Sequence, residues 1–290
     1  MRGKAQKLWR ELQNEEAKME FGLCTYCYTW AVGFEGHRPG KPMDAMGFLE
    51  KAAAYSVGLA QFSDNMDLTG FSDAQLSEIK RFASENNIEI QVGTRGFPAI
   101  PRYCEIATAL GAKLVRAVID DPDGRMTSGA IAAELEKLLP LLEVNGLVLA
   151  LENHDHISSY TYADVLSETG SGNIRICLDT TNSIGIGEGI KETIGLLAPY
   201  VANVHIKDYC IYRPYHKLGL VVEGRPAGQG MLDIPALVKM FWGATAVLEL
   251  WTAPEANDAD TIAKEEQWVK ESVSYIKSVI ADIAGEAEGT

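Results

Sequence analysis

Short apolar runs alternate with longer amphipathic stretches from residue 20 onward. Each run is rich in Val, Ile, Leu or Ala and has the length of a strand that is buried on both faces, as the strands of a parallel sheet are. The pattern predicts eight strands, over residues 20–26, 58–63, 88–94, 113–119, 146–153, 174–180, 201–208 and 246–251.

The stretches between these runs have helical spacing, most clearly over residues 43–58, 72–87 and 128–146. Ser72 with Gln75 three positions later is typical of a capping box, and Asn145-Gly146 favours a helix end. Eight strand–helix repeats without a composition break predict a single closed (β/α)8 (TIM) barrel. An open doubly wound sheet is the alternative, but it predicts a glycine-rich phosphate loop after the first strand, and TYCYTWAVGFEG is not one.

The N-terminus departs from this pattern. Residues 1–18 are charged throughout and lack the apolar stretch of a signal peptide. They fit either a short amphipathic helix through Leu8, Trp9 and Leu12 or an irregular extension. We therefore expect an N-terminal extension over residues 1–18 and a barrel domain over residues 19–290.

Charge and cysteine content narrow the classes of function. The 290-residue chain has 26 Lys and Arg against 40 Asp and Glu, a net charge of −14, which argues against binding to nucleic acid. No run approaches the roughly 18 apolar residues of a membrane span. Five cysteines, including a Cys24-x-x-Cys27 pair inside a strand-like run, do not resemble a secreted disulfide framework. We expect a cytoplasmic enzyme that does not bind membranes.

Four potential metal ligands lie at or near the ends of four successive predicted strands: Glu152, Asp179, His205 and Glu249. In a parallel barrel these ends meet at one mouth. One acid alone often just caps the following helix, but three carboxylates together would repel one another without a cation. Oxygen donors with one imidazole suit Mn²⁺, Co²⁺, Mg²⁺ or Zn²⁺. The sequence therefore predicts a divalent metal site, with Mn²⁺ preferred.

The motifs ALENHDH, ICLDTTNS, VHIKD, GRPAGQGMLDIPALV and LEL resemble the xylose-isomerase-like sugar phosphate isomerase/epimerase family, over most of residues 20–280. The resemblance implies a (β/α)8 barrel with one divalent metal, and Glu152, Asp179, His205 and Glu249 as its ligands. It also implies that Glu152 and Glu249 are the catalytic pair that transfers protons in the epimerases.

Two features depart from the family's epimerases. Many relatives carry His three positions after the Asp, whereas this chain has Asn182, which can hydrogen-bond a substrate hydroxyl but cannot shuttle a proton. The Asn-Arg pair that precedes the strand-five Glu in ketose 3-epimerases is also missing. Around the mouth, Lys207, Arg95 and Trp251 are candidate substrate-binding residues, and His154 is a candidate catalytic base because residues two apart in a strand share a face.

Two enzyme hypotheses follow. The first is a sugar isomerase or epimerase, in which the metal stabilises an enediolate and Glu152 and Glu249 move the proton. The second is a lyase that forms the same enediolate and then expels a β leaving group from a keto sugar, such as a 3-keto glycoside or an inosose. A sugar-binding barrel without activity is a third reading. The substrate is a small sugar or keto sugar in either enzyme, and a homo-oligomer or a small partner subunit is left open.

Overall fold

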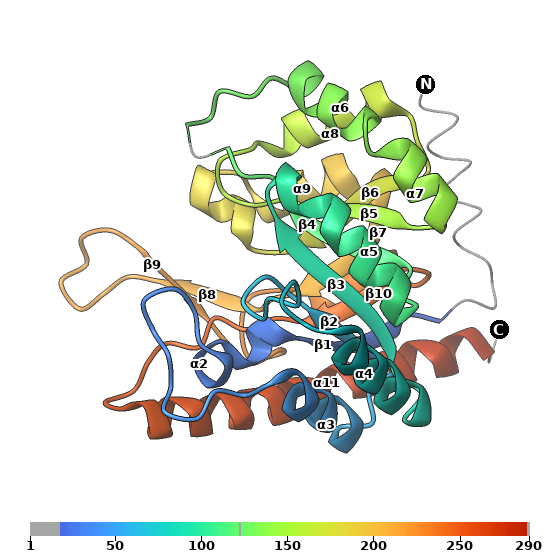
Figure 1. The fold of residues 1–290 in the computed structure, drawn as a ribbon. Coiled ribbons are helices and arrows are strands. Elements are labelled where there is room, and N and C mark those ends of the chain that lie inside the picture. The colour runs from blue at the N-terminus through green and yellow to red at the C-terminus, as the bar shows by residue number, and fades with distance from the viewer. Residues whose placement is uncertain (1–17, 122, 289–290) are drawn as a thin grey trace.

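The computed structural model describes residues 18–121 and 123–288 and shows a closed barrel of eight parallel strands (Figure 1). The barrel strands are β1 (Glu20–Cys24), β2 (Leu59–Phe62), β3 (Glu89–Arg95), β4 (Leu114–Val118), β5 (Val148–Glu152), β6 (Ile174–Asp179), β7 (Val201–Ile206) and β10 (Thr245–Leu248). Each of the eight predicted runs overlaps one of them, and β3 and β10 each extend one residue beyond the predicted bounds. Because β1 pairs with both β2 and β10, the sheet closes, and the open-sheet alternative is wrong.

Helices follow the strands and cover the outside of the barrel (Figure 1). They are α2 (Thr29–Val32), α3 (Ala45–Ala54), α4 (Asp73–Glu85), α5 (Ile100–Leu110), α6 (Ser128–Glu136), α7 (Leu139–Asn145), α8 (Ser159–Thr169), α9 (Ile190–Leu197), α10 (Ile234–Met240) and α11 (Asp258–Glu288). Short 3-10 turns are η1 (Thr25–Tyr28), η2 (Phe97–Ala99), η3 (Asn182–Ile186) and η4 (Ala198–Tyr200).

Local signals explain where several helices begin and end. The Ser72–Gln75 capping box is formed at the start of α4, and Gly146 ends α7 in the left-handed conformation with φ of 60°. The predicted helix over residues 128–146 is wrong in one respect, because it is broken into α6 and α7. Pro140 stands in the first turn of α7, where its missing N–H costs no helical hydrogen bond.

The main apolar core lies between the strands and the helices that cover them. None of the helices among the described residues is long and apolar enough to cross a membrane. The predicted extension over residues 1–18 lies outside the described residues except for Lys18, so the domain boundary stays a prediction.

The segment from Tyr209 to Gly230, between β7 and α10, is not an irregular loop. It contains an antiparallel hairpin of β8 (Tyr209–Tyr212) and β9 (Val221–Gly224), which forms a separate two-stranded sheet. Gly224 permits the hairpin to lie against the barrel, because a Cβ there would stand 2.2 Å from the carbonyl oxygen of Trp251.

Candidate active site

The four predicted metal ligands converge at the carboxyl ends of the strands. Glu152 ends β5, Asp179 ends β6, His205 lies on β7, and Glu249 directly follows β10. All four side chains are buried, and one ligand atom from each lies within 4.8 Å of the other three. The parallel register causes this convergence, since Asp179 pairs with His205 across β6 and β7.

Asp179 is oriented by the turn that follows it. Its Oδ1 accepts backbone hydrogen bonds from Thr181 and Asn182, each 2.7 Å long, at the start of η3. Its Oδ2 is buried and lies 2.9 Å from the ammonium nitrogen of Lys207. One carboxylate oxygen is thus fixed by the backbone, and the other faces the cation of Lys207 and the remaining ligands.

His205 is oriented from below by Gln61 on β2. His205 Nε2 lies 2.8 Å from Gln61 Oε1. The Gln61 amide nitrogen donates to Gln91 and Asn203, so Oε1 is the acceptor and His205 Nε2 carries the hydrogen. The free Nδ1 therefore faces the carboxylates, 2.9 Å from Glu249 Oε2 and 3.6 Å from Glu152 Oε2. A hydrogen bond that fixes the second nitrogen is the usual support of a metal-binding histidine.

These residues fit a divalent cation. Asp179 Oδ2 and His205 Nδ1 are both buried, and they lie with carboxylate oxygens of Glu152 and Glu249 around the same point. With its hydrogen on Nε2, His205 presents the lone pair of Nδ1 to these oxygens, an arrangement that a cation between them stabilises. Burial acts to lower the pKa of His205, but Cys177 and Glu152 raise it well above its usual range. Positive charge is thus favoured at this point, as either a proton or a metal ion.

Lys207 and Asn182 link the ligands to one another. Lys207 Nζ lies 2.9 Å from Asp179 Oδ2, 2.5 Å from Glu249 Oε1, and 2.9 Å from Asn182 Oδ1. The amide nitrogen of Asn182 donates to Glu152 Oε1 at 2.9 Å. Burial acts to lower the pKa of Lys207, but Asp179 and Glu249 raise it above its usual range, so the ammonium stays charged.

Glu249 is the most strongly perturbed carboxylate of the set. Burial acts to raise its pKa, but Lys207 and His205 hold that pKa well below its usual range. Glu249 is therefore an anion at neutral pH, and it is a weak base in the chain alone.

The opposite wall of the mouth carries an ion-pair chain that the sequence did not reveal. Arg116 on β4 is buried, and its Nε donates a short hydrogen bond to Glu152 Oε2. Its NH1 donates to Asp64 Oδ1 at 2.6 Å. Arg95 contacts the same Asp64, with Nε 3.4 Å from Oδ2, and its NH1 donates to Asp120 at 3.0 Å. Arg116 thus forms a buried ion pair with Glu152 and a second ion pair with Asp64.

Asp64 was missed, although a signal existed. It follows β2 by two residues, in the same position relative to its strand as other predicted site residues. Burial acts to raise its pKa, but Arg116 and Arg95 lower it to a value below its usual range, so Asp64 is an anion. The sequence analysis did not predict Gln61 either, although a polar residue inside an apolar strand could have indicated a role in the barrel.

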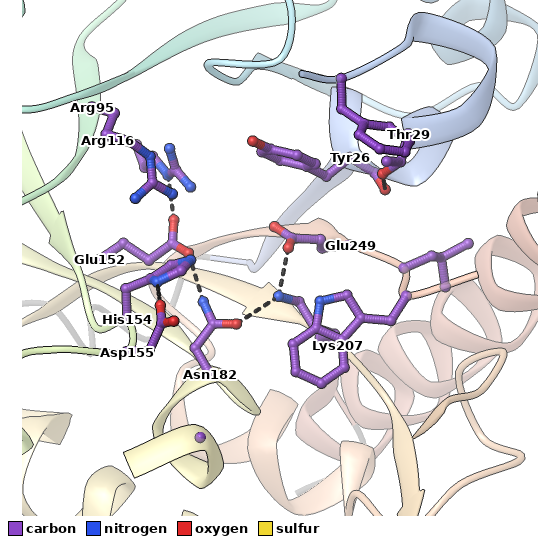
Figure 2. A pocket seen from close by; sticks show the side chains of 14 residues that line it. Tyr26, Thr29, Arg95, Arg116, Glu152, His154, Asp155, Asn182, Lys207 and Glu249 are labelled. Carbon is purple, nitrogen blue, oxygen red and sulfur yellow. Dashed lines mark hydrogen bonds and ion pairs between the residues drawn. The ribbon is translucent and has the colours of Figure 1, made fainter. Parts of the chain in front are cut away.

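A cavity of about 440 Å³ opens above the ligands. The four predicted substrate-binding residues line it: Arg95, Asn182, Lys207 and Trp251. So do two of the ligands, the candidate base and two further aromatic side chains: Glu152, Glu249, His154, Tyr26 and Phe34 (Figure 2). The Trp251 ring lies 4.6 Å from Lys207 Nζ. Figure 2 shows Arg95 and Arg116 on one side of this cavity and Glu249 and Lys207 on the other.

His154 lies at the rim and contacts Asp155 through Nδ1. Burial, with help from the positive charges of Arg95 and Lys207, lowers its pKa to about 4 against the opposing effect of Glu152. Its imidazole is therefore neutral at physiological pH, which is the state a base requires.

Two further residues have structural roles. Asp208 accepts backbone hydrogen bonds from Gly228, Gly230 and Leu232, so it holds the segment that leads to α10. The Cys24 and Cys27 thiols are free and buried, and Cys27 donates to the Leu248 carbonyl, in agreement with the end of a core strand.

Residues 49–279 match the family of xylose isomerase-like TIM barrels. The chain belongs to this family. This confirms the resemblance that the strand-end motifs indicated.

Curated relatives and solved structures agree with this membership. The chain is 28% identical over 264 residues to 3-oxo-isoapionate decarboxylase of Pectobacterium atrosepticum, which covers 89% of this chain and 95% of that protein. D-psicose 3-epimerase of Clostridium cellulolyticum H10 superposes with a TM-score of 0.67 at 14% identity, over 90% of this chain and 99% of that one. A xylose isomerase-like TIM barrel protein of Mycobacterium smegmatis in complex with magnesium superposes with a TM-score of 0.61 at 12% identity, over 90% and 98% of the two chains. The two structural likenesses show the shared fold alone.

Proposed function

We propose that this chain is a divalent-metal-dependent lyase that decarboxylates a 3-oxo sugar acid. The decarboxylase of Pectobacterium atrosepticum supports this reaction class, because the similarity runs over nearly its whole length. A divalent ion held by the four ligands would supply a Lewis acid that stabilises negative charge on the substrate's ketone oxygen.

The observation that carries the proposal is that both oxygens of Glu152 and of Glu249 already have hydrogen-bond or ion-pair partners. Glu152 accepts hydrogen bonds from Asn182 on Oε1 and from Arg116 on Oε2. Glu249 lies against Lys207 with Oε1 and against His205 with Oε2. Epimerisation needs one group to remove a proton and another to return it. Decarboxylation needs no base, since the electron pair comes from the bond to the carboxylate.

The proposed decarboxylation breaks one carbon–carbon bond and adds one proton from solvent. The bond between the carboxylate carbon and the carbon next to the ketone breaks, and its electron pair forms an enediolate or enolate. Carbon dioxide leaves, and one proton adds to that carbon to give the ketone product. The three N–H groups of Lys207 are directed at Asp179, Glu249 and Asn182, so its ammonium would stabilise the developing negative charge as a fixed cation at the cavity floor. The rings of Tyr26, Phe34 and Trp251 line the same cavity.

The charge of the cavity also supports an acidic substrate. Four carboxylates, of Asp64, Glu152, Asp179 and Glu249, interact with three cations, of Arg95, Arg116 and Lys207. These seven groups sum to one negative charge. A bound divalent ion would take the place of the proton on His205 and would bring the sum to one positive charge. That balance suits a substrate with one negative charge better than an uncharged ketose.

Isomerisation or epimerisation of a sugar is the second candidate. It is favoured by the convergence of Glu152 and Glu249 on one point. An epimerase needs a pair of carboxylates that face the substrate's C–H from two sides, and a bound ion would draw both away from their present partners.

One experiment separates the candidates. Purified protein is loaded with Mn²⁺, Mg²⁺, Co²⁺ or Zn²⁺, or stripped with a chelator, and incubated in D₂O with 3-oxo sugar acids, free ketoses and 3-keto glycosides. We expect metal-dependent release of carbon dioxide with one deuterium in the product. Exchange into a ketose without carbon dioxide would select the epimerase instead, and release of an aglycone would select β-elimination.

A further inference from the structure

The β8–β9 hairpin is the part of the described structure that the proposed function does not use. Figure 1 shows it projecting from the end of the barrel, away from the helices. Its base is fixed, because Arg225 and Met231 donate backbone hydrogen bonds to Asp208 and Tyr209. Its tip, residues 213–220, forms no strand and belongs to no core cluster.

The tip exposes large apolar side chains. Tyr215 is 96% exposed, Leu218 78% and Leu220 64%. Tyr212 and Val222 on the adjoining strands are exposed as well. Apolar side chains that gather on one projecting element mark an interaction surface. A two-stranded hairpin is also marginally stable in water unless it packs against something else.

The charge of the hairpin differs from that of the chain. Between Asp208 and Glu223 there is no acidic residue, and Arg213 and Lys217 lie at the tip. The whole chain carries a net charge of −14. An apolar and basic tip therefore complements the acidic surface that the rest of the same chain presents.

We infer that residues 213–220 dock on a second copy of this chain, so that the protein self-associates through this hairpin. Nucleic acid fits the tip less well, because the remainder of the molecule repels phosphates. The apolar side chains supply the buried area of the contact, and Arg213 and Lys217 supply its orientation.

The test is sedimentation velocity on the full chain, over a wide range of protein concentration and at low and high salt. We expect a dimer or higher oligomer in the wild type. The triple variant Tyr215→Ser, Leu218→Ser, Leu220→Ser should raise the dissociation constant by at least about 50-fold. The matched control is Val144→Ser on α7, which removes an apolar side chain that is 86% exposed but distant from the hairpin in the sequence.

Charge reversal gives an independent test. Lys217→Glu should weaken association and reduce its salt dependence, whereas Lys113→Glu, an exposed lysine outside the hairpin, should not. Circular dichroism checks that each variant is folded. A monomeric wild type would overturn the inference, as would an oligomer that the triple variant leaves intact or a wild type that binds anionic vesicles without self-association.

Discussion

The two halves of the barrel mouth differ in how their charges are held. On the half formed by β5, β6, β7 and β10, three carboxylates and His205 face one point. Backbone N–H groups orient Asp179 there, and Gln61 orients His205. On the half formed by β1 to β4, Asp64, Arg95 and Arg116 hold one another through ion pairs between their side chains. The first half is arranged to receive a cation, and the second half neutralises Glu152 and sets the charge of the cavity.

The largest effect is expected from Asp179→Asn, on the first half. The variant keeps the oxygen that accepts the Thr181 and Asn182 hydrogen bonds and replaces the free Oδ2 by an amide nitrogen. We expect kcat/KM to fall by at least about 100-fold together with the loss of bound metal. Elemental analysis and the decarboxylation assay measure the two effects. Asp120→Asn at the rim is the control, and retained metal with full activity would contradict the assignment.

Arg116→Met tests the second half. It leaves the buried Glu152 and the half-buried Asp64 without their shared cation, so we expect a loss of about 3 kcal/mol in the free energy of unfolding of the metal-free protein. Urea denaturation measures this loss. Added metal should restore part of it, because the ion would take over the neutralisation of Glu152.

A double variant makes that test specific. Asp64→Asn removes one of the two carboxylates that Arg116 serves, so the combined loss should be smaller than the sum of the single losses. Additive losses would mean that the two side chains stabilise the fold independently.

Gln61→Leu tests the link between the halves, because Gln61 lies on β2 and supports His205 on β7. We expect metal affinity to fall about 10-fold, since loss of such a supporting hydrogen bond typically has effects of that size. Titration with Mn²⁺ measures this. Gln91→Leu, which removes a neighbour of Gln61 that does not contact His205, should have a smaller effect.

The smallest expected effect is on the pH dependence of stability, and it comes from Glu265, where α11 packs against α2. Glu265 on α11 is buried and accepts the backbone N–H groups of Trp30 and Ala31 in α2. Burial raises its pKa to about 7, against the opposing effect of these two donors. The raised pKa means that its contribution to stability is present below pH 4.5 and is lost as the pH rises to about 7.

The measurement is urea denaturation of the wild type and of Glu265→Gln at several pH values. Between pH 5 and pH 7, the free energy of unfolding of the wild type should fall by on the order of 1–2 kcal/mol more than that of the variant. Equal pH dependence in the two proteins would show that Glu265 is ionised in the folded protein throughout this range.

The sequence allowed the fold and the first half to be predicted, but not the second half. Glu152, Asp179, His205 and Glu249 stand at or near strand ends, and a parallel barrel brings such positions together whatever the loops do. Arg116 stands in the middle of β4, and its partners Asp64 and Glu152 are separated from it by 52 and 36 residues. Such pairings depend on side-chain length and strand register, which a hydrophobic pattern does not contain. The hairpin was missed because its strands are only four residues long and lack regular alternation.

The side-chain chain formed by Asp64, Arg95 and Arg116 has a consequence for how such barrels diversify. Within the described part of the chain, its hydrogen bond to the ligand set is the one from Arg116 to Glu152. Substitutions after β2 and on β3 and β4 can therefore alter the charge that a substrate must carry while the opposite strands keep their metal ligands. A barrel of this kind can in this way change its substrate and retain the same metal ion.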